Sequence, residues 1–440
     1  MRVTLVQPAM GHRPGERFMR TWQMEPLAPA VLARLSPPGV ELRFHDDRME
    51  PIPFDEPTDL VALPVETYTA RRSYEIAGAF RRRGVKVVLG GVHAALAPGE
   101  VERFADAVVV GEAEGVWPRV LEDAASGRLA RAYHASPASS GTWATPDRSI
   151  FAGRRYLPLA LVETGRGCPH HCEFCVIAAC HGSTRRWRPV ESVVEEVRSL
   201  GRRTVFFVDD AITCQREPAM QLFEAIAPLR VRWVSQAGIE CARDPEMLAA
   251  MRASGCIGLL IGLESLSRSA LARMGKERNG GLSQYEQDVV ALKRAGIELY
   301  ATLLFGYEED VEETFDEALA FALRHRFYLA AFNHLVPFPG TPLYERLGRE
   351  GRLASEAWWL DPAFRFNDAP FQPRHLSAQR LRERCLELRT RYYRADRILR
   401  RALTPRGSAL LQAMLLPINW QMRREVRQRD GFPLGDSRPV

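Results

Sequence analysis

The chain has 440 residues, of which 46% are hydrophobic and 26% are charged, an ordinary composition for a globular protein of two or three domains. Its formal net charge is +6. The segment from Ser377 to Arg401 contains nine arginines and three acidic residues, so this segment alone accounts for the net charge. No run of about 18 uncharged apolar residues occurs and the N-terminus lacks the apolar core of a signal peptide, so we expect neither a membrane span nor secretion.

The first 133 residues alternate short apolar runs with stretches of helical periodicity, which predicts a small parallel α/β domain of Rossmann type over 1–133. Ligands bind such sheets at the carboxyl ends of the strands. The predicted strands are Val3–Gln7, Glu41–His45, Asp59–Pro64, Val85–Leu89 and Ala107–Val110, and the predicted helices are Pro29–Leu35 and Ala70–Arg83.

Three loops at that predicted edge contain glycine or acidic residues, and glycine lets a ligand approach the backbone closely. Taken alone, Gly90-Gly91 is equally consistent with a plain strand-to-helix turn, and His93 with a histidine on a surface loop. The candidate binding residues at this edge are Glu66, Thr67, Gly90, Gly91, His93, Gly111 and Glu112.

Residues 134–153 are rich in Ala, Ser, Pro and Gly and are predicted to be a linker. A second α/β series follows over 154–345, and six strands separated by helical stretches predict a partial (β/α)6 barrel with its chemistry at the carboxyl ends of the strands. The predicted strands are Leu159–Glu163, Thr204–Val208, Val231–Ala237, Gly258–Leu263, Glu298–Phe305 and Ala330–Val336, and Val190–Leu200 is predicted to be helical.

Cys168, Cys172 and Cys175 follow the first of these strands with the spacing C-x3-C-x2-C. Three such thiolates can hold three irons of a [4Fe–4S] cluster and leave the fourth iron open. Zinc is the alternative, but structural zinc sites pair two closely spaced ligands with a second pair farther along, and no second pair follows here. A cysteine cluster of this kind needs a reducing compartment, which predicts a cytoplasmic protein.

The run from Gly165 to Cys175 resembles the signature of the radical S-adenosylmethionine (SAM) superfamily. The resemblance implies that the open iron binds SAM and splits it reductively to a 5′-deoxyadenosyl radical, with an electron from an external reductant such as flavodoxin or ferredoxin. It also implies a set of SAM-binding residues at the strand ends, namely Phe174, Asp209, Asp210, Gln236, Glu264, Ser265 and Gly306.

Physical arguments support several of these roles. Asp209 and Asp210 end the second barrel strand, and adjacent carboxylates repel each other unless a cation such as the ammonium of SAM lies nearby; the alternative is that one of them caps the next helix. Glu264 follows the fourth strand, where its carboxylate would accept hydrogen bonds from both ribose hydroxyls. Gly306 would let adenine pack closely against the fifth strand.

The N-terminal loops resemble the cobalamin-binding domain of one large class of radical SAM enzymes. Val65-Glu66-Thr67 and Gly90-Gly91 occupy the positions of that domain's Ser-x-Leu-like turn and Gly-Gly, and Ala105 to Gly115 is similar to its last strand and turn. The resemblance assigns the seven candidate residues of this edge to cobalamin. No Asp-x-His-x-x-Gly supplies a histidine beneath the cobalt, and the segment between Asp47 and the next strand is too short for the usual crossover helix.

Residues 346–440 are predicted to be an aromatic-rich and helical C-terminal region. Its apolar residues from Ser377 to Arg401 recur at steps of four and three, which predicts one helix with a buried stripe and a basic outer face. That face is either solvated or directed at an anionic partner or membrane surface, and specific nucleic-acid binding is not expected. Ala409–Trp420 is apolar, too short to span a bilayer, and flanked by arginines, so binding to a membrane surface is one interpretation.

The resemblance implies a radical SAM enzyme that performs cobalamin-dependent methylation of an unactivated carbon in a small-molecule or lipid-like substrate. Relatives in this class methylate hopanoid lipids, tryptophan or pigment precursors. Two alternatives remain: a radical rearrangement, oxidation or ring formation without methyl transfer, with or without cobalamin, and a non-catalytic metal-binding interaction module. A transfer-RNA methylthiolase is excluded because residues 1–167 contain no cysteine. The sequence predicts no catalytic residue outside these cofactor sites.

Overall fold

The computed structural model describes residues 1–13, 15, 23–135 and 143–436. The chain forms two compact units. Unit 1 comprises 1–158, 357–366 and 432–440, and unit 2 comprises 159–356 and 367–431. Within the C-terminal region expected from the sequence, the segments 357–366 and 432–436 group with unit 1.

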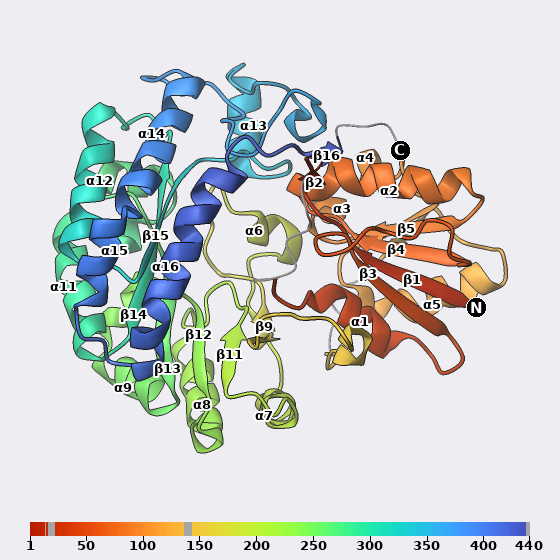
Figure 1. The fold of residues 1–440 in the computed structure, drawn as a ribbon, viewed down its shortest axis with the longest axis horizontal. Helices are drawn as coiled ribbons and strands as arrows, with labels where there is room; N and C mark the ends of the chain where they lie inside the picture. The colour runs from red at the N-terminus through yellow and green to blue at the C-terminus, as the bar shows by residue number, and fades with distance from the viewer. Residues whose placement is uncertain (14, 16–22, 136–142, 437–440) are drawn as a thin grey trace. The chain divides into compact units, whose positions relative to one another are not determined.

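Unit 1 is built on a parallel six-stranded sheet with the strand order β3-β1-β4-β5-β6-β7. Helices α1 and α5 cover one face and α2, α3 and α4 cover the other (Figure 1). This is the Rossmann-like layer that the alternating pattern predicted. The strands are β1 Arg2–Gln7, β3 Glu41–Asp46, β4 Leu60–Pro64, β5 Lys86–Gly90, β6 Ala107–Val110 and β7 Ala132–His134, and the helices are α1 Leu27–Leu35, α2 Ala70–Arg82, α3 Val92–Leu96, α4 Pro98–Val101 and α5 Trp117–Ala125.

Unit 1 agrees with the expected elements at the β3–β4 connection and departs from them at β7. The connection from β3 to β4 contains no helix, as the short segment after Asp47 indicated. The sequence missed β7, which has only three residues and a single buried side chain, Tyr133. The end of the predicted linker also belongs to the unit 1 core, because Phe151 packs edge-on against Phe44 with ring centroids 5.2 Å apart.

The C-terminal end of the chain returns to unit 1. Strand β16 (Gly435–Asp436) pairs with β2 (Gly11–His12), and the Asp436 carboxylate accepts a hydrogen bond of 2.7 Å from Arg72. Arg72 is buried and also donates to both carboxylate oxygens of Asp47 at 2.8 Å. A buried arginine shared by two carboxylates fixes this end of the chain to α2.

Unit 2 contains the second parallel sheet, with the strand order β15-β14-β13-β12-β11-β8. The strands follow one another in sequence order around an open barrel, which confirms the predicted partial (β/α)6 arrangement. The strands are β8 Ala160–Val162, β11 Thr204–Phe207, β12 Arg232–Ala237, β13 Cys256–Glu264, β14 Glu298–Phe305 and β15 Leu329–His334, and the intervening helices are α7 Val190–Ser199, α8 Arg216–Ile226, α9 Pro245–Ala253, α10 Arg268–Arg273, α11 Leu282–Arg294 and α12 Glu312–Arg324.

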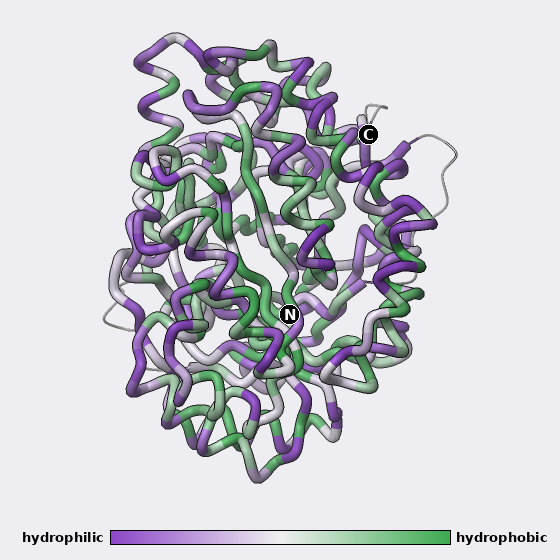
Figure 2. The backbone as a smooth tube through the Cα atoms, turned by 90° about the vertical axis from the view of Figure 1, so that its left-hand side faces the viewer, coloured by the Kyte–Doolittle hydropathy of each residue, from purple (hydrophilic) through white to green (hydrophobic). Residues whose placement is uncertain are grey.

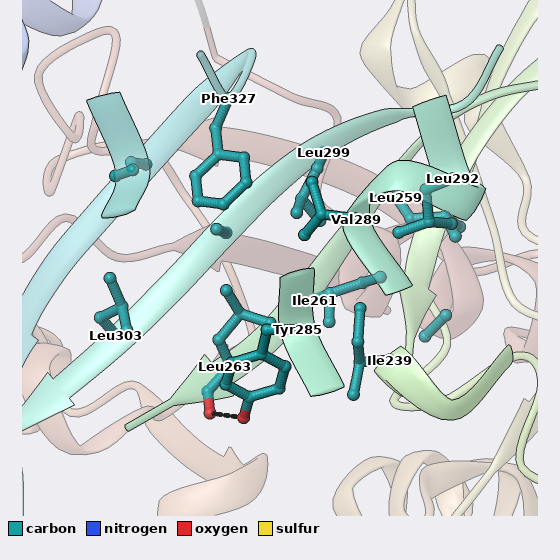
Figure 3. Close-up of a cluster of buried hydrophobic side chains, with 14 of the residues drawn as sticks. Ile239, Leu259, Ile261, Leu263, Tyr285, Val289, Leu292, Leu299, Leu303 and Phe327 are labelled. Carbon is teal, nitrogen blue, oxygen red and sulfur yellow. Dashed lines mark hydrogen bonds between the residues drawn. The ribbon is translucent and has the colours of Figure 1, made fainter. Parts of the chain in front are cut away.

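The core of unit 2 lies between this sheet and its outer helices. Hydrophobic segments follow the strands and hydrophilic stretches follow the outer helices (Figure 2). Figure 3 shows the packing at the middle of the sheet, where Leu259, Ile261 and Leu263 of β13 meet Val289 and Leu292 of α11. This dry, close-packed layer holds the strand ends rigidly in position.

The predicted basic helix is two helices. α14 spans Ala378–Tyr392, and α15 spans Ala395–Ala402. Tyr393 and Arg394 separate the two helices. The buried stripe runs through α14 as expected, but Leu399 is 53% exposed and Ile398 is buried instead. The break between the helices rotates α15 about its axis, so the prediction of one continuous stripe was wrong. α13 (Pro342–Arg349) precedes these helices and α16 (Ala409–Arg429) follows them.

None of the helices in the described residues is long and apolar enough to cross a membrane.

Candidate active site

The cysteine loop leaves the carboxyl end of β8 and is closed at its base by a short antiparallel pair. β9 (Gly165–Arg166) pairs with β10 (Arg186–Trp187) on the far side of the loop. Gly167 has φ +86°, and a Cβ there would come within 2.4 Å of the Thr184 carbonyl oxygen. Glycine is therefore required just before Cys168, because any side chain would open the base of the loop.

Two other segments of unit 2 hold the loop around Glu173. The Glu173 amide donates to the Met274 carbonyl after α10 (3.2 Å), and its own carbonyl accepts from the Leu343 amide at the start of α13 (2.9 Å). Its carboxylate accepts two hydrogen bonds from Arg346, at 2.8 and 3.2 Å. Glu173, the residue after the second cysteine, is thus fixed by four hydrogen bonds within the protein.

Cys172 is buried, and Cys168 and Cys175 are partly exposed. Burial raises the pKa of the Cys175 thiol to about 11, and the nearby Cys172 and Cys168 act in the same direction. A bound iron would supply the positive charge that turns these thiols into thiolates. In the described residues no three or more His, Cys, Asp or Glu side chains are arranged to hold one metal ion. A cubane does not require that arrangement, since each cysteine binds a different iron, and the three cysteines fit it.

Arg278 lies beside the cluster cysteines and was not predicted as a site residue. Its Nη2 donates to the Cys172 sulfur at 3.8 Å, and its Nη1 donates to the Gly275 carbonyl at 3.1 Å. Its Nε is 3.6 Å from the Glu240 carboxylate, which orients the guanidinium. Hydrogen bonds to cluster sulfurs are one of the means by which proteins set the potential of an iron–sulfur centre. The residue lies 103 positions after Cys175 in sequence, so no local motif signals it.

Asp209 and Asp210 end β11 in different environments. Asp209 and Arg185 have fully buried side chains and form an ion pair of 2.6 Å, and the Asp209 carboxylate also accepts from the Thr164 amide at 3.2 Å. Asp210 is partly exposed, burial raises its pKa, and its carboxylate accepts from the Gly167 amide next to Cys168. The charge on Asp209 is therefore already paired within the protein, and Asp210 is the carboxylate at the cysteine loop.

Glu264 occupies a strained position at the end of β13. Its φ is +63°, which is rare for a residue other than glycine, and the register with β14 shifts beside it. Its carboxylate pairs with Lys276 at 2.7 Å. A Cβ on Gly262 would come within 2.0 Å of this carboxylate and 2.8 Å of the Lys276 nitrogen, so glycine makes room for the pair.

Two side chains hold the backbone just before Glu264. The Tyr285 hydroxyl donates to the Leu263 carbonyl at 2.6 Å, the dashed contact in Figure 3, and the Asn279 amide donates to the Gly262 carbonyl at 2.9 Å. Both side chains are buried. Strained backbone of this kind, held in place by surrounding structure, concentrates at functional sites.

The remaining predicted SAM residues are placed as follows. Phe174 packs on the core, with the Lys276 nitrogen 5.9 Å from its ring centre. Gln236 is half-buried on β12, and the Ser265 hydroxyl accepts from the Ser267 amide at 3.1 Å. Gly306 has φ +115°, and the space that its Cβ would need is filled by Phe371, 2.7 Å away. Packing by Phe371 accounts for glycine at 306 without adenine.

The arginines after the cysteine loop are not on a solvated loop. Arg185 pairs with Asp209, and its guanidinium lies 4.5 Å from the centre of the Trp187 ring. Arg188 is buried and pairs with buried Glu196 on α7. Each of these arginines neutralises a buried carboxylate beneath the loop, so loss of either partner would leave an uncompensated buried charge.

The corresponding edge of unit 1 has a different character. Glu66 follows β4, Gly91 follows β5 and Gly111 follows β6, and all three are exposed on these adjacent strands. Gly91 has φ +93°, and a Cβ there would approach the Val65 amide nitrogen to 2.8 Å. Gly90 and Glu112 are half-buried beside them. The exposed backbone at these glycines suits a cofactor that approaches main-chain groups closely, so the edge fits the cobalamin prediction.

Thr67 and His93 are part of the wall of that edge. His93 is fully buried, with its Nδ1 3.1 Å from the Thr67 hydroxyl and its Nε2 3.0 Å from the Glu100 carboxylate. Glu100 also accepts from Tyr74 at 2.7 Å and from the Trp359 indole at 3.0 Å. Both imidazole nitrogens are engaged, so His93 is held as a structural residue and is not placed as a ligand beneath cobalt.

Comparison with known proteins identifies the family. A model of the radical SAM superfamily matches residues 162–322. Bacteriochlorophyllide d C-12(1)-methyltransferase of Chlorobaculum tepidum is 30% identical over 409 residues, which cover 90% of this chain and 86% of that protein. The hopanoid C-2 methylase of Rhodopseudomonas palustris is 27% identical over 358 residues, which cover 76% of this chain and 66% of that protein.

Solved structures match the fold across both units. TsrM of Kitasatospora setae, a radical SAM methyltransferase with cobalamin and a [4Fe–4S] cluster bound, gives a TM-score of 0.61 at 20% identity and covers 79% of this chain and 78% of its own. OxsB, a cobalamin-dependent SAM radical enzyme, gives a TM-score of 0.66 at 14% identity. The match covers 97% of this chain and 72% of OxsB. At these identities the likeness establishes the fold. The [4Fe–4S] cluster and SAM predicted as cofactors are confirmed with the family. The chain belongs to the radical SAM superfamily, in its methyltransferase branch, and carries the fold of that branch's B12-binding region at its N-terminus.

Proposed function

We propose that this enzyme is a cobalamin-dependent methyltransferase that alkylates an unactivated carbon of an apolar biosynthetic intermediate, with a tetrapyrrole as the first substrate class to test. The observation that carries the proposal is the 30% identity to a bacteriochlorophyllide d methyltransferase along 90% of the chain. The exposed glycine edge of unit 1 supports the cobalamin part of the proposal, because it leaves main-chain groups open to a cofactor.

The residues of unit 2 would divide the work of binding the cluster and SAM. Cys168, Cys172 and Cys175 hold the cluster, Asp210 accepts hydrogen bonds from the SAM ammonium, and Glu264 accepts them from the ribose. When bound, the cluster and SAM supply a carbon-centred radical, and cobalamin supplies the methyl group. The protein's part is to fix these groups relative to one another and to keep water away.

Lys276 gives Glu264 a specific role. A buried carboxylate paired at 2.7 Å with an ammonium group keeps one orientation. Hydroxyl donors of a nucleoside bound at the strand end would complete the hydrogen bonds of this carboxylate. Because Lys276 and Arg278 lie on the same turn, this segment contacts both the Glu264 carboxylate and the Cys172 sulfur.

Unit 1 would hold cobalamin through Glu66 and the backbone around Gly90, Gly91 and Gly111, with Glu112 at the rim. His93 stays in its network with Thr67 and Glu100, so no histidine from this position would bind the cobalt.

The test is an anaerobic assay of enzyme purified from cells supplied with cobalamin. With SAM, reduced flavodoxin and bacteriochlorophyllide, we expect 5′-deoxyadenosine, S-adenosylhomocysteine and a product heavier by one methylene group. Cys172→Ala serves as the matched inactive control. Absence of a corrinoid in the purified holoenzyme, or cleavage of SAM with no methylated product from any tetrapyrrole offered, would remove the proposal.

Ring formation is the second candidate. The anaerobic magnesium-protoporphyrin IX monomethyl ester cyclase of Rubrivivax gelatinosus is 25% identical over 327 residues, 65% of this chain and 57% of that protein. The same assay separates the two functions, because cyclisation changes the substrate without adding a carbon and forms no S-adenosylhomocysteine.

A further inference from the structure

The arginines of the C-terminal helices fall into two groups. On α14, Arg380 pairs with Glu312 at 2.6 Å, and Arg384 and Arg391 each pair with Asp316 at 2.7 Å. Both acidic residues belong to α12, which packs against α14. The basic face that the sequence predicted on this helix is therefore neutralised within the protein.

Three arginines of α15 and α16 are not neutralised in this way. Arg400, Arg424 and Arg427 are exposed, and none has an acidic partner among the described residues. Exposed arginines without a carboxylate partner form a cationic surface that attracts anions. The uncompensated charge of this region therefore lies on the last two helices of unit 2.

The same two helices expose large apolar side chains at helical spacing. Leu399 and Leu403 are four residues apart on and just after α15, with 53% and 84% exposure, and Leu416 and Trp420 are four apart on α16, with 42% and 48%. The helices lie side by side (Figure 1), joined by hydrogen bonds of 2.7 Å from Gln412 to the Ala402 carbonyl and 2.8 Å from Arg401 to Asn419. Four of the eight large hydrophobic residues that the described chain exposes gather on this pair of helices.

A small cavity lies between the C-terminal end of α14 and helix α16. It has a volume of about 40 Å³ and is lined by Thr390, Tyr393, Arg394, Arg423, Val426 and Arg427. Three of these six residues are arginines, and the Arg423 guanidinium also lies 5.2 Å from the centre of the exposed Trp420 ring. Guanidinium groups around a recess, next to an indole, are suited to the phosphate of a lipid headgroup above its acyl chains.

We propose that α15 and α16 form a docking surface for an anionic phospholipid membrane. Leu399, Leu403, Leu416 and Trp420 enter the boundary between headgroups and acyl chains, and the uncompensated arginines contact lipid phosphates, one of them at the cavity beside Trp420. A nucleic acid would not need the exposed leucines. An acidic protein would suit the charge, but exposed leucines flanked by arginines and an interfacial tryptophan are the pattern of a helix that lies on a bilayer.

The test is co-sedimentation of the holoenzyme with vesicles at low ionic strength. We expect binding to vesicles of phosphatidylcholine containing about one third phosphatidylglycerol, loss of binding at high salt, and little binding to pure phosphatidylcholine. Arg424→Gln with Arg427→Gln should weaken binding by at least an order of magnitude, since each basic residue near such a surface contributes about fivefold in affinity. Leu399→Ser with Leu403→Ser should weaken vesicle binding more than the two arginine substitutions do, and more than high salt alone does.

Two matched variants control for charge and apolarity. Arg380→Gln removes one positive charge from α14, where Glu312 already compensates it, and Leu282→Ser removes one exposed leucine (42% exposed) from α11. Both should bind vesicles like the wild type. All variants should keep the iron content and SAM cleavage of the wild type, so the result does not depend on the substrate proposed above.

Three outcomes would overturn the proposal. These are no binding to anionic vesicles, equal loss of binding in the control variants, and arginine variants that lose affinity for an acidic protein such as flavodoxin while their vesicle binding is unchanged.

Discussion

The carboxyl edges of the two parallel sheets share an architecture but differ in chemistry. In unit 2 the strand ends carry charged side chains that are paired within the protein, such as Asp209 with Arg185 and Glu264 with Lys276. In unit 1 the strand ends expose glycine backbone at Gly91 and Gly111. Buried ion pairs hold groups in one geometry, whereas bare backbone admits a ligand's own surface. The comparison indicates that one edge is pre-organised for charged groups and the other is open for main-chain contact.

The largest expected effect comes from the cluster loop. Cys172→Ala removes one of the three thiolates, so we expect iron content and formation of 5′-deoxyadenosine to fall to background. Cys385→Ala is the matched control, because Cys385 is buried in α14 and its loss should leave the cluster in place. Iron retained at wild-type level in Cys172→Ala would show that this loop is not the cluster site.

Asp209→Asn tests whether the paired charges of unit 2 hold its edge together. The substitution leaves the buried guanidinium of Arg185 without a carboxylate, which costs about 3–5 kcal/mol in the free energy of unfolding. Asp210→Asn should leave stability nearly unchanged and weaken SAM binding instead. Urea unfolding and equilibrium dialysis with SAM measure the two effects; equal losses of stability in both variants would contradict the distinction.

The pKa of Glu308 predicts how the stability of unit 2 changes at low pH. Burial raises the pKa of its carboxyl, but the guanidinium groups of Arg352 and Arg346 outweigh burial and bring it to about 2. A depressed carboxyl pKa contributes stability that is present above pH 4.5 and lost as the pH falls towards 2. Glu308→Gln should therefore be less stable than the wild type in urea at pH 7, and the gap should close on acidification. A difference in the free energy of unfolding between the two proteins that stays constant down to pH 3 would argue against the pairing of Glu308 with Arg346 and Arg352.

Glu264→Gln compares ligand binding at the two edges directly. We expect the dissociation constant for SAM to rise about 10- to 100-fold, because hydrogen bonds to a charged group contribute about 1.5–3 kcal/mol. Glu66→Gln at the unit 1 edge should leave SAM binding unchanged and reduce the cobalamin content. Isothermal titration with SAM and the visible spectrum of the purified enzyme report the two effects, and a reversed pattern would exchange the roles of the edges.

The smallest effect is expected at Arg278. Arg278→Met removes the donor to the Cys172 sulfur while leaving the cysteines in place, so iron content should stay normal. The midpoint potential of the cluster should become more negative, because the lost N–H and positive charge stabilise the reduced cluster. Arg273→Met, nearby and paired with Glu309 at 2.9 Å, is the control. A redox titration monitored by electron paramagnetic resonance measures the midpoint potential of the cluster. An unchanged potential in Arg278→Met would make Arg278 a structural residue.

Local patterns predicted the elements well because they are set by neighbours in sequence. Hydrophobic periodicity located β14 and β6 to the residue, and the cysteine spacing located the loop. The three-residue β7 and the break at Tyr393 escaped because each depends on packing against distant segments. The role of Gly306 is likewise explained by Phe371, which is 65 positions away.

The sequence by itself determined the class of chemistry and the order of the two sheets, because a metal-binding loop and strand periodicity are encoded within a few adjacent residues. Only the tertiary structure decided which charged side chains are neutralised by partners within the protein. It paired Asp209 with Arg185 and placed Arg278 beside Cys172. It also paired Arg380, Arg384 and Arg391 of α14 with carboxylates of α12, and it left Arg400, Arg424 and Arg427 exposed without an acidic partner among the described residues. Electrostatic partners are chosen by distance in space, and that distance is fixed only when strands and helices far apart in the chain pack together.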